Sequence, residues 1–108
     1  MTRGEIYRVA APPNKDPRKQ RCFVIVSRQT LLDSKAAHAV CAPVNTDGHG
    51  LETEIQIGEE AGLKHSSYVN CDQLVRLEKS RLTNFVGSLP KMKLTALNRS
   101  LRIALDLE

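Results

Sequence analysis

Cys22-Phe23-Val24-Ile25-Val26 is the stretch that decides the fold, because a continuous apolar run with a β-branched bias is typical of a buried strand. Arg21 stands immediately before this strand, and residues 15–20 form a basic, proline-containing loop ahead of it. A guanidinium at the first residue of a rigid core strand is well placed to meet a phosphate chain. The same residues also fit a solvated turn that keeps the strand end soluble.

The segments on either side of this strand continue the β pattern. Residues 5–10 alternate polar and apolar side chains and are followed by two prolines, and a cluster of turn formers, residues 45–50, ends the next apolar run. Besides 22–27, strands or strand-like pieces are predicted at 5–10, 37–44, 51–57, 68–71, 73–77 and 84–89. Residues 58–66 read as a surface connection between strands.

From Pro90 onward the apolar period changes from two to between three and four. Leu94, Leu97 and Leu101 recur at helical spacing with basic residues between them, which predicts an amphipathic helix over about 90–106. Residues 28–34 fit a single helical turn. The pattern predicts a mainly β chain of about five to seven short antiparallel strands in a small barrel or strongly curled sheet, with the terminal helix packed on it.

Length and composition restrict the class of protein. A chain of 108 residues predicts one domain, 1–108, and a net charge of +4 favours a nucleic acid or an acidic protein as partner. The three cysteines form no CxxC pair and lie in apolar segments, so we expect reduced thiols. Without a signal peptide or a membrane-length apolar run, a cytoplasmic protein with no membrane partner is expected.

Polar residues at strand ends are the candidates for chemistry, because the chain has none of the local motifs that common enzyme classes carry. The scattered histidines predict no metal site, and no cofactor is expected. The candidates are Arg21, Asn45, Thr46, His49, Asp72 and Gln73.

Several short motifs occur in an order that resembles the MazF/PemK (Kid) toxins of toxin-antitoxin pairs. They are Arg3-Gly4-Glu5-Ile6-Tyr7, Arg21 before Phe23-Val24-Ile25-Val26-Ser27, Ala42-Pro43-Val44-Asn45-Thr46, Gly62-Leu63-Lys64, Val69-Asn70-Cys71-Asp72-Gln73, Lys79-Ser80-Arg81-Leu82 and Leu101-Arg102-Ile103-Ala104-Leu105. The resemblance spans nearly the whole chain. It implies an SH3-like barrel of the CcdB/MazF/PemK type that forms a homodimer.

The resemblance also implies an activity and partners. The expected function is a metal-independent, sequence-specific endoribonuclease that cleaves single-stranded RNA, usually mRNA, by attack of a 2′-hydroxyl. A cognate antitoxin protein would neutralise it, and operator DNA would be met only through that antitoxin.

The family's site residues transfer to this chain position by position. Arg21 matches the catalytic arginine, and the loop cations Lys15, Arg18 and Lys19 become candidate phosphate contacts that also meet the antitoxin. Asn45 stands where relatives usually carry a catalytic hydroxyl. Since an amide lends no proton as a hydroxyl does, either Thr46 reaches in or the site works with altered efficiency.

Three further positions complete the expected RNA site. His49, in a glycine-flanked loop, has an imidazole suited to acid or base work, although it also fits a loop residue with no task. Asp72 and Gln73 match a pair that faces RNA in the family and would read base edges, whereas Asp72 alone also fits a turn cap. Asn70 stands where some relatives carry an arginine.

A second hypothesis keeps the fold and loses the chemistry. The same barrel resembles the CcdB toxins, which bind a protein target and cleave nothing. With asparagines at positions 45 and 70, a degenerate site retained for binding a protein is the alternative function.

Overall fold

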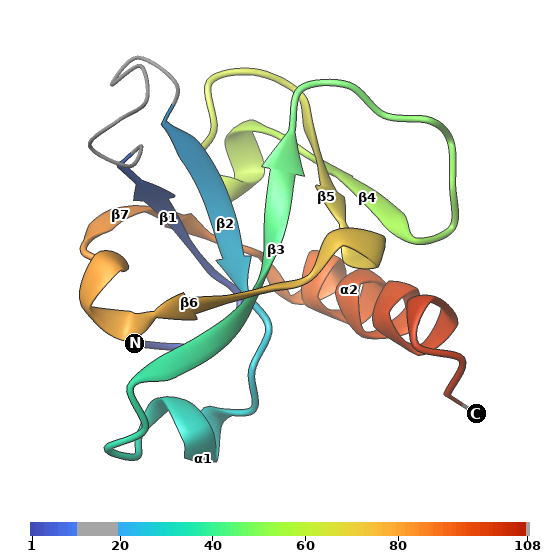
Figure 1. Cartoon of the computed structure of the whole chain (residues 1–108). Helices are drawn as coiled ribbons and strands as arrows, with labels where there is room; N and C mark the ends of the chain where they lie inside the picture. Colours follow the sequence, from blue (N-terminus) through green and yellow to red (C-terminus); the bar gives the residue numbers. More distant parts are fainter. Residues whose placement is uncertain (11–19, 108) are drawn as a thin grey trace.

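A seven-stranded antiparallel sheet curls into a half-barrel in the computed structural model, which describes residues 1–10 and 20–107 (Figure 1). The strands are β1 (Glu5–Val9), β2 (Arg21–Ile25), β3 (His38–Asn45), β4 (Glu54–Ile57), β5 (Ser67–Asn70), β6 (Val75–Glu78) and β7 (Asn84–Ser88). The helices are α1 (Gln29–Leu32) and α2 (Lys91–Ala104), and the 3-10 turns are η1 (Glu59–Ala61), η2 (Cys71–Gln73) and η3 (Lys79–Arg81). The predicted mainly β fold with a C-terminal helix is confirmed.

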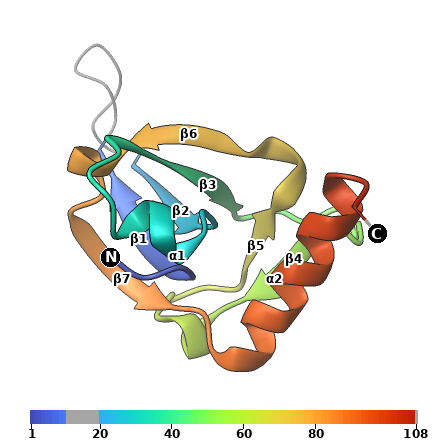
Figure 2. The same ribbon diagram turned by 90° about the horizontal axis from the view of Figure 1, so that it is seen from below.

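The sheet runs in the order β4-β5-β3-β2-β1-β7, and β6 pairs with β3 outside that path. The long strand β3 therefore has different partners along its length. Its first half pairs with β6, and its last residues, Val44 and Asn45, pair with β5. The intervening turn η2 lets the chain leave β5 and return along the other half of β3. This bend curls the sheet (Figure 2).

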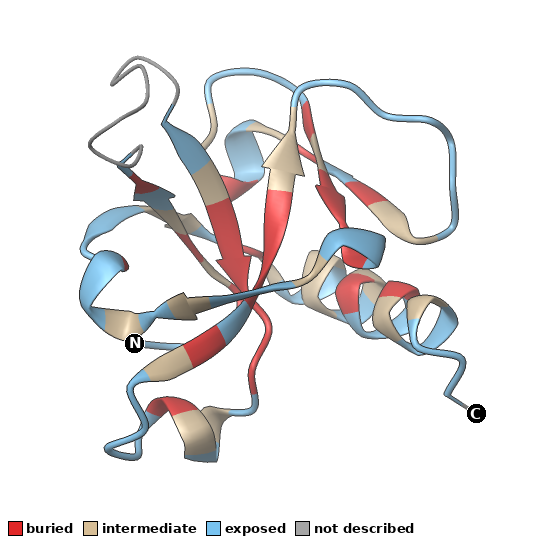
Figure 3. Ribbon diagram, in the orientation of Figure 1, coloured by how far each residue is buried: buried red, intermediate tan, exposed pale blue. Residues whose placement is uncertain are grey.

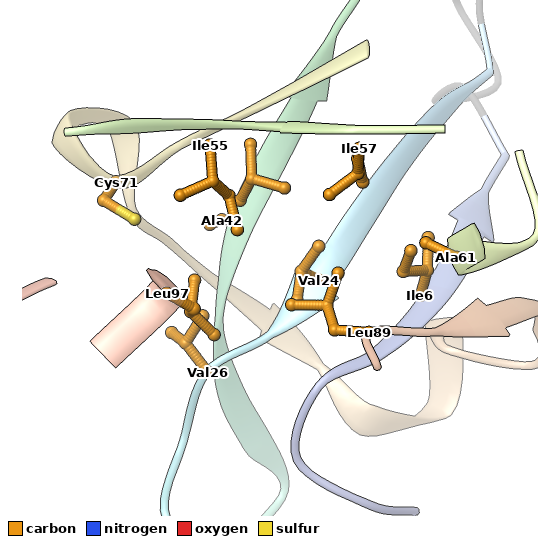
Figure 4. Close-up of a cluster of buried hydrophobic side chains, with 11 residues drawn as sticks. Ile6, Val24, Val26, Ala42, Ile55, Ile57, Ala61, Cys71, Leu89 and Leu97 are labelled. Carbon is orange, nitrogen blue, oxygen red and sulfur yellow. The ribbon is translucent and has the colours of Figure 1, made fainter. Parts of the chain in front are cut away.

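The continuous apolar run of β2 is explained by burial on both faces of the sheet. Val24 faces a cluster that α2 covers with Leu97, shown in Figure 4, whereas Phe23 and Ile25 face a second cluster that contains Leu32 of α1. Successive side chains of a strand point to opposite faces, so each face receives its own apolar layer. Figure 3 shows the buried residues gathered in β2, β3, β5 and the inner side of α2. Truncating Leu97, which is fully buried, would cost about 2–5 kcal/mol.

Gly87 in β7 closes the half-barrel against the segment after β4. A Cβ built on Gly87 would lie 2.0 Å from the carbonyl oxygen of Ala61, so only glycine lets the two backbones approach this closely. This contact joins the β7 edge of the sheet to the η1 turn.

Two local expectations differ from the structure. The strand predicted over 51–57 begins only at Glu54, because residues 51–53 form a turn in which the Glu54 amide donates to the Leu51 carbonyl. Cys71 and Gln73, expected at the ends of strand-like pieces, lie in η2. Side chains alternate in both segments as they would in a strand, but the backbone hydrogen bonds within the turns set the backbone conformation.

Candidate active site

Arg21 and Asn45 meet where β2 begins and β3 ends. The antiparallel register pairs Cys22 with Val44, which brings the preceding Arg21 level with Asn45. The Nη2 of Arg21 donates a hydrogen bond to Oδ1 of Asn45 over 2.7 Å. Two residues far apart in the sequence are thus joined by the pairing of two core strands.

The guanidinium of Arg21 is held on a second side by an aromatic ring. Its Cζ lies 5.7 Å from the ring centroid of Phe23, a distance at which a cation is attracted to the aromatic face. The residue is nevertheless exposed, and its guanidinium makes no other hydrogen bond to a described residue. A guanidinium has five N–H donors, so most of those of Arg21 make no hydrogen bond within residues 1–10 and 20–107.

A pocket of about 540 Å³ opens beside Arg21. Its lining combines polar side chains with the apolar residues Cys22, Val44 and Leu63. The lining residues are Gln20, Arg21, Cys22, Val44, Asn45, Thr46, Asp47, His49, Leu63 and Ser67. The pocket therefore combines one fixed cation with amide, hydroxyl, carboxyl and imidazole groups.

Asn45 links Arg21 to the η2 turn. While its oxygen accepts from Arg21, its Nδ2 donates to Oε1 of Gln73 over 3.4 Å. Asn45 is only partly exposed, and both ends of its amide are engaged. This arrangement fixes the guanidinium and connects it to a residue that the sequence singled out for base recognition.

Asp72 is oriented by two neighbours. Oδ1 of the buried Asn70 accepts a hydrogen bond from the Asp72 amide over 2.8 Å and thereby caps η2. The Asp72 Oδ2 accepts from the Thr53 hydroxyl over 2.5 Å. The asparagine at position 70 therefore has a structural task, and the exposed carboxylate of Asp72 is held in place from the turn before β4.

The segment between β3 and β4 is held by Glu54. One oxygen of its carboxylate, Oε1, accepts backbone hydrogen bonds from His49 over 2.9 Å and from Leu51 over 3.2 Å. These two bonds lower the pKa of Glu54 below its ordinary value, because they stabilise the ionised form. The position of the His49 backbone is thus set by a carboxylate that the sequence reasoning did not single out.

Gly48 lies against the ring of Tyr68. A Cβ at position 48 would approach the ring to 2.6 Å, so a side chain there would displace the segment that carries Thr46 and His49. Tyr68 is paired with Asn45 across β3 and β5, so its contact with Gly48 holds the segment after β3 against β5.

The structure brings most of the candidate residues together. Arg21, Asn45, Thr46 and His49 line one pocket, and Gln73 adjoins it through Asn45. Asp72 is in the same turn as Gln73 but does not line the pocket. The candidates Lys15, Arg18 and Lys19 lie outside the described residues.

Sequence reasoning missed several pocket residues. Gln20, Asp47 and Ser67 line the pocket, and Thr53 orients Asp72. Asp47 was within reach, since it belongs to the cluster of turn formers that follows Thr46. Ser67 carried no signal, because only the pairing of β5 with β3 brings it to the site.

Three further findings concern the buried thiols, metal ligands and the helices. Burial raises the pKa of Cys41 to about 12 and that of Cys71 to about 11, with the Asp72 charge contributing at Cys71, so both thiols stay protonated at neutral pH. No group of His, Cys, Asp or Glu within residues 1–10 and 20–107 is arranged to hold a metal ion. None of the helices in the described part of the chain is long and apolar enough to cross a membrane.

Fold and site together define a class: small antiparallel half-barrels with a C-terminal helix and an open, arginine-bearing pocket at one end of the sheet. A family model described as the PemK-like, MazF-like toxin of type II toxin-antitoxin systems matches residues 2–105. The chain therefore belongs to the PemK-like, MazF-like toxin family, as the ordered motifs predicted.

Solved structures of similar fold agree with this family. The Mycobacterium tuberculosis toxin MazF-mt6 is 25% identical, with a TM-score of 0.82 over 96% of this chain and 98% of that one. A mycobacterial endoribonuclease in complex with its cognate antitoxin is 24% identical, with a TM-score of 0.85 over 100% and 97%. A MazE-MazF structure from Deinococcus radiodurans is 16% identical, with a TM-score of 0.79 over 100% and 98%. A search of curated proteins found no match.

Proposed function

We propose that this chain is an endoribonuclease toxin that cleaves single-stranded RNA, with mRNA as the expected substrate, at the pocket beside Arg21. The observation that carries the proposal is that Asn45 and the Phe23 ring hold the Arg21 guanidinium at the lining of an open pocket. Membership of the toxin family and the likeness to chains named as endoribonucleases support it.

The reaction that fits this pocket is an internal transesterification. The 2′-oxygen of one ribose forms a bond to the adjacent phosphorus while the bond from phosphorus to the 5′-oxygen of the next nucleotide breaks. A base takes the proton of the 2′-hydroxyl, an acid gives one to the departing 5′-oxygen, and the products are a 2′,3′-cyclic phosphate and a 5′-hydroxyl. The phosphorane between them carries more negative charge than the substrate, and a fixed guanidinium stabilises that increase.

Arg21 and Asn45 take different roles in this scheme. Arg21 donates to the nonbridging phosphate oxygens, for which its planar fork is suited. Asn45 acts as a positioning residue, because its oxygen is occupied by Arg21 and its nitrogen faces Gln73. The exposed Thr46, next along the chain and also in the pocket, supplies the hydroxyl that Asn45 lacks.

Two pocket groups can move the protons. Asp47 and His49 are exposed and line the pocket, and a carboxylate with an imidazole makes an ordinary base and acid pair. Asp47→Asn and His49→Gln are each expected to remove one limb of the pH-rate profile. A profile that neither substitution alters would remove both residues from the proton transfers.

Sequence preference would come from the η2 turn. Asp72 is a pure acceptor held by Thr53, and Gln73 offers an amide that both donates and accepts. Unpaired bases expose their edges to such groups in single-stranded RNA. The loop cations Lys15, Arg18 and Lys19 are proposed as further phosphate contacts on sequence grounds.

The proposed partners follow the family. A homodimer is expected, and an acidic antitoxin is proposed to cover the basic face and to mediate any contact with operator DNA. Support for the antitoxin comes from similar chains that are named as complexes with a cognate antitoxin or with MazE.

The deciding experiment uses purified protein and a long single-stranded RNA, with EDTA in one arm and Mg²⁺ in the other. Defined fragments with 2′,3′-cyclic phosphate ends in both arms are expected. Cleavage in the Mg²⁺ arm alone would overturn metal independence. RNA that stays intact in both arms at high protein concentration would favour the CcdB-like alternative, in which the pocket only binds a protein.

A further inference from the structure

A second pocket lies at the same end of the sheet as Arg21. It has a volume of about 360 Å³ and is formed by the end of β1, the start of β7 and the turn η3. In Figure 1 these segments lie on the left of the molecule, on the far side of β2 from the end of β3. The polar residues of its lining are Arg8, Arg81, Gln20, Thr83 and Asn84.

Two arginines from separate elements converge on this pocket. Arg8 projects from β1, where it pairs across the sheet with Asn84 of β7, and Arg81 belongs to η3. Both are exposed, and Nη2 of Arg81 donates to the Ala10 carbonyl over 3.3 Å, which anchors one corner of its guanidinium. The ion pairs within the described residues are Lys93 with Glu60 and Arg99 with Glu52, so neither arginine has a carboxylate among them.

The two pockets share a wall. Gln20 lines both, and the sheet order places β3, β2, β1 and β7 side by side. With neighbouring strands about 4.8 Å apart, the ends of β3 and β7 are separated by roughly 14 Å. A single nucleic-acid strand of a few nucleotides spans such a distance.

We propose that the Arg8–Arg81 pocket binds a phosphodiester of the same RNA strand whose scissile phosphate lies at Arg21. This inference rests on the proposed function and adds a second contact to it. Two guanidinium forks suit a phosphate that carries a full negative charge and several acceptor oxygens. The amides of Gln20 and Asn84 and the hydroxyl of Thr83 can each donate and accept hydrogen bonds. Ribose hydroxyls and base edges also do both, whereas a peptide carboxylate only accepts and has no use for the acceptors of this pocket.

The test measures binding separately from cleavage. Labelled 2′-O-methyl RNA pools have no free 2′-hydroxyl to attack. Lengths of about 2 and about 12 nucleotides are chosen, because the single phosphodiester of a dinucleotide fills one pocket at a time and the longer strand fills both. The double variant Arg8→Ala/Arg81→Ala is compared with Lys91→Ala/Arg102→Ala, which removes the same charge from exposed positions of α2. Thermal unfolding of both double variants checks that the fold is kept. The milder double variant Arg8→Gln/Arg81→Gln is measured in the same way.

The expected result is a selective loss for long RNA. The Arg8/Arg81 variant binds the longer pool about tenfold more weakly, and its slope of log affinity against log salt falls by roughly 0.7, as for the loss of one neutralised phosphate. The shorter pool and the α2 variant show no such change. An equal loss for both lengths would overturn the proposal, because it would indicate only the general positive field.

Two other outcomes also test the proposal. Unchanged binding of long RNA together with lost binding of a polyglutamate peptide would assign the pocket to an acidic protein and overturn the proposal. Failure of the proposed function is read separately, from cleavage of unmodified RNA by the wild-type chain. A wild-type chain that binds the long pool through Arg8 and Arg81 without cutting RNA would retain this inference and lose the nuclease.

Discussion

Two cations, Lys79 of η3 and Arg21 of β2, are held in opposite ways. Lys79 of η3 donates to the carbonyl oxygens of Leu31 over 2.8 Å, Leu32 over 3.2 Å and Ser34 over 3.0 Å, at the α1 end of the molecule. Arg21, the first residue of β2, donates to one side-chain oxygen over 2.7 Å and lines an open pocket. The three N–H groups of the lysine are all used by backbone, whereas most of those of the arginine make no hydrogen bond to the part of the chain that the structure describes.

This difference separates a structural cation from a functional one. Both residues carry one positive charge, and charge alone does not distinguish them in the sequence. Backbone carbonyls that end a short helix need a donor, and Lys79 supplies it. A guanidinium that is fixed by Asn45 and Phe23 beside an open pocket is instead placed to receive an anion.

The largest effect is expected from Arg21→Ala. Removal of one preorganised donor to the transition state lowers a rate about 100- to 1000-fold, while an exposed substitution changes stability by about 0.5 kcal/mol or less. Single-turnover RNA cleavage and thermal unfolding measure the two quantities. Arg102→Ala is the matched control, because it removes an exposed cation from α2. Residual cleavage near the wild-type rate would show that the charge comes from elsewhere.

Lys79→Met tests the other side of the comparison. The variant loses charge-assisted hydrogen bonds to three carbonyls, and we expect the free energy of unfolding to fall by about 1.5–3 kcal/mol in urea titrations. RNA cleavage well below the unfolding midpoint stays at the wild-type rate. A variant that keeps its stability but loses cleavage would reverse the assignment of the two cations.

Asn45→Ala tests whether holding the Arg21 guanidinium in one orientation contributes to the cleavage rate. Without the hydrogen bond from Nη2, Arg21 samples more orientations, and the single-turnover rate is expected to fall about tenfold. Thr46→Ala is measured beside it, since the neighbouring hydroxyl is the other candidate at this position. Equal and negligible losses in the two variants would remove both residues from the site.

The smallest effect concerns Glu54 and pH. Its pKa is lowered by the His49 and Leu51 amides, so these hydrogen bonds are fully present above the ordinary value of 4.5 and are lost as the pH falls through the lowered value. The protection of the His49 and Leu51 amides against hydrogen exchange, taken relative to the intrinsic rate at each pH, should therefore fall at acid pH in the wild-type chain. In Glu54→Gln the exchange should show no such transition. A transition that persists in the variant would point to another titrating group.

The local elements were largely predictable because their signals are strong. The β2 run is apolar without interruption, and Leu94, Leu97 and Leu101 repeat at helical spacing after a proline. The start of β4 was wrong, since residues 51–53 alternate like a strand but form a turn on Leu51 and Glu54. Alternation reports which side chains face the core, and it does not report where the backbone finds its hydrogen bonds.

The candidate site was predictable only in part. Arg21, Asn45 and Thr46 could be named because they adjoin strong apolar runs and match a family pattern in order. Ser67 and Thr53 could not be named from the sequence. Ser67 reaches the pocket only because β5 pairs with β3, and Thr53, in the turn before β4, reaches the site through its hydrogen bond to Asp72. Asn70, which with Asn45 belongs to the alternative of a degenerate binding site, caps η2 from a buried position, a role that the sequence did not indicate.

By itself the sequence determined the strands that must be buried, the terminal amphipathic helix, the excess of positive charge and the identity of the group, Arg21, that begins the central strand. Only the tertiary structure decided which cation donates its hydrogen bonds to backbone carbonyls and which one lines an open pocket. That distinction depends on whether backbone carbonyls or an open pocket surround the charged group, and both are created by strand pairing between residues far apart in the chain.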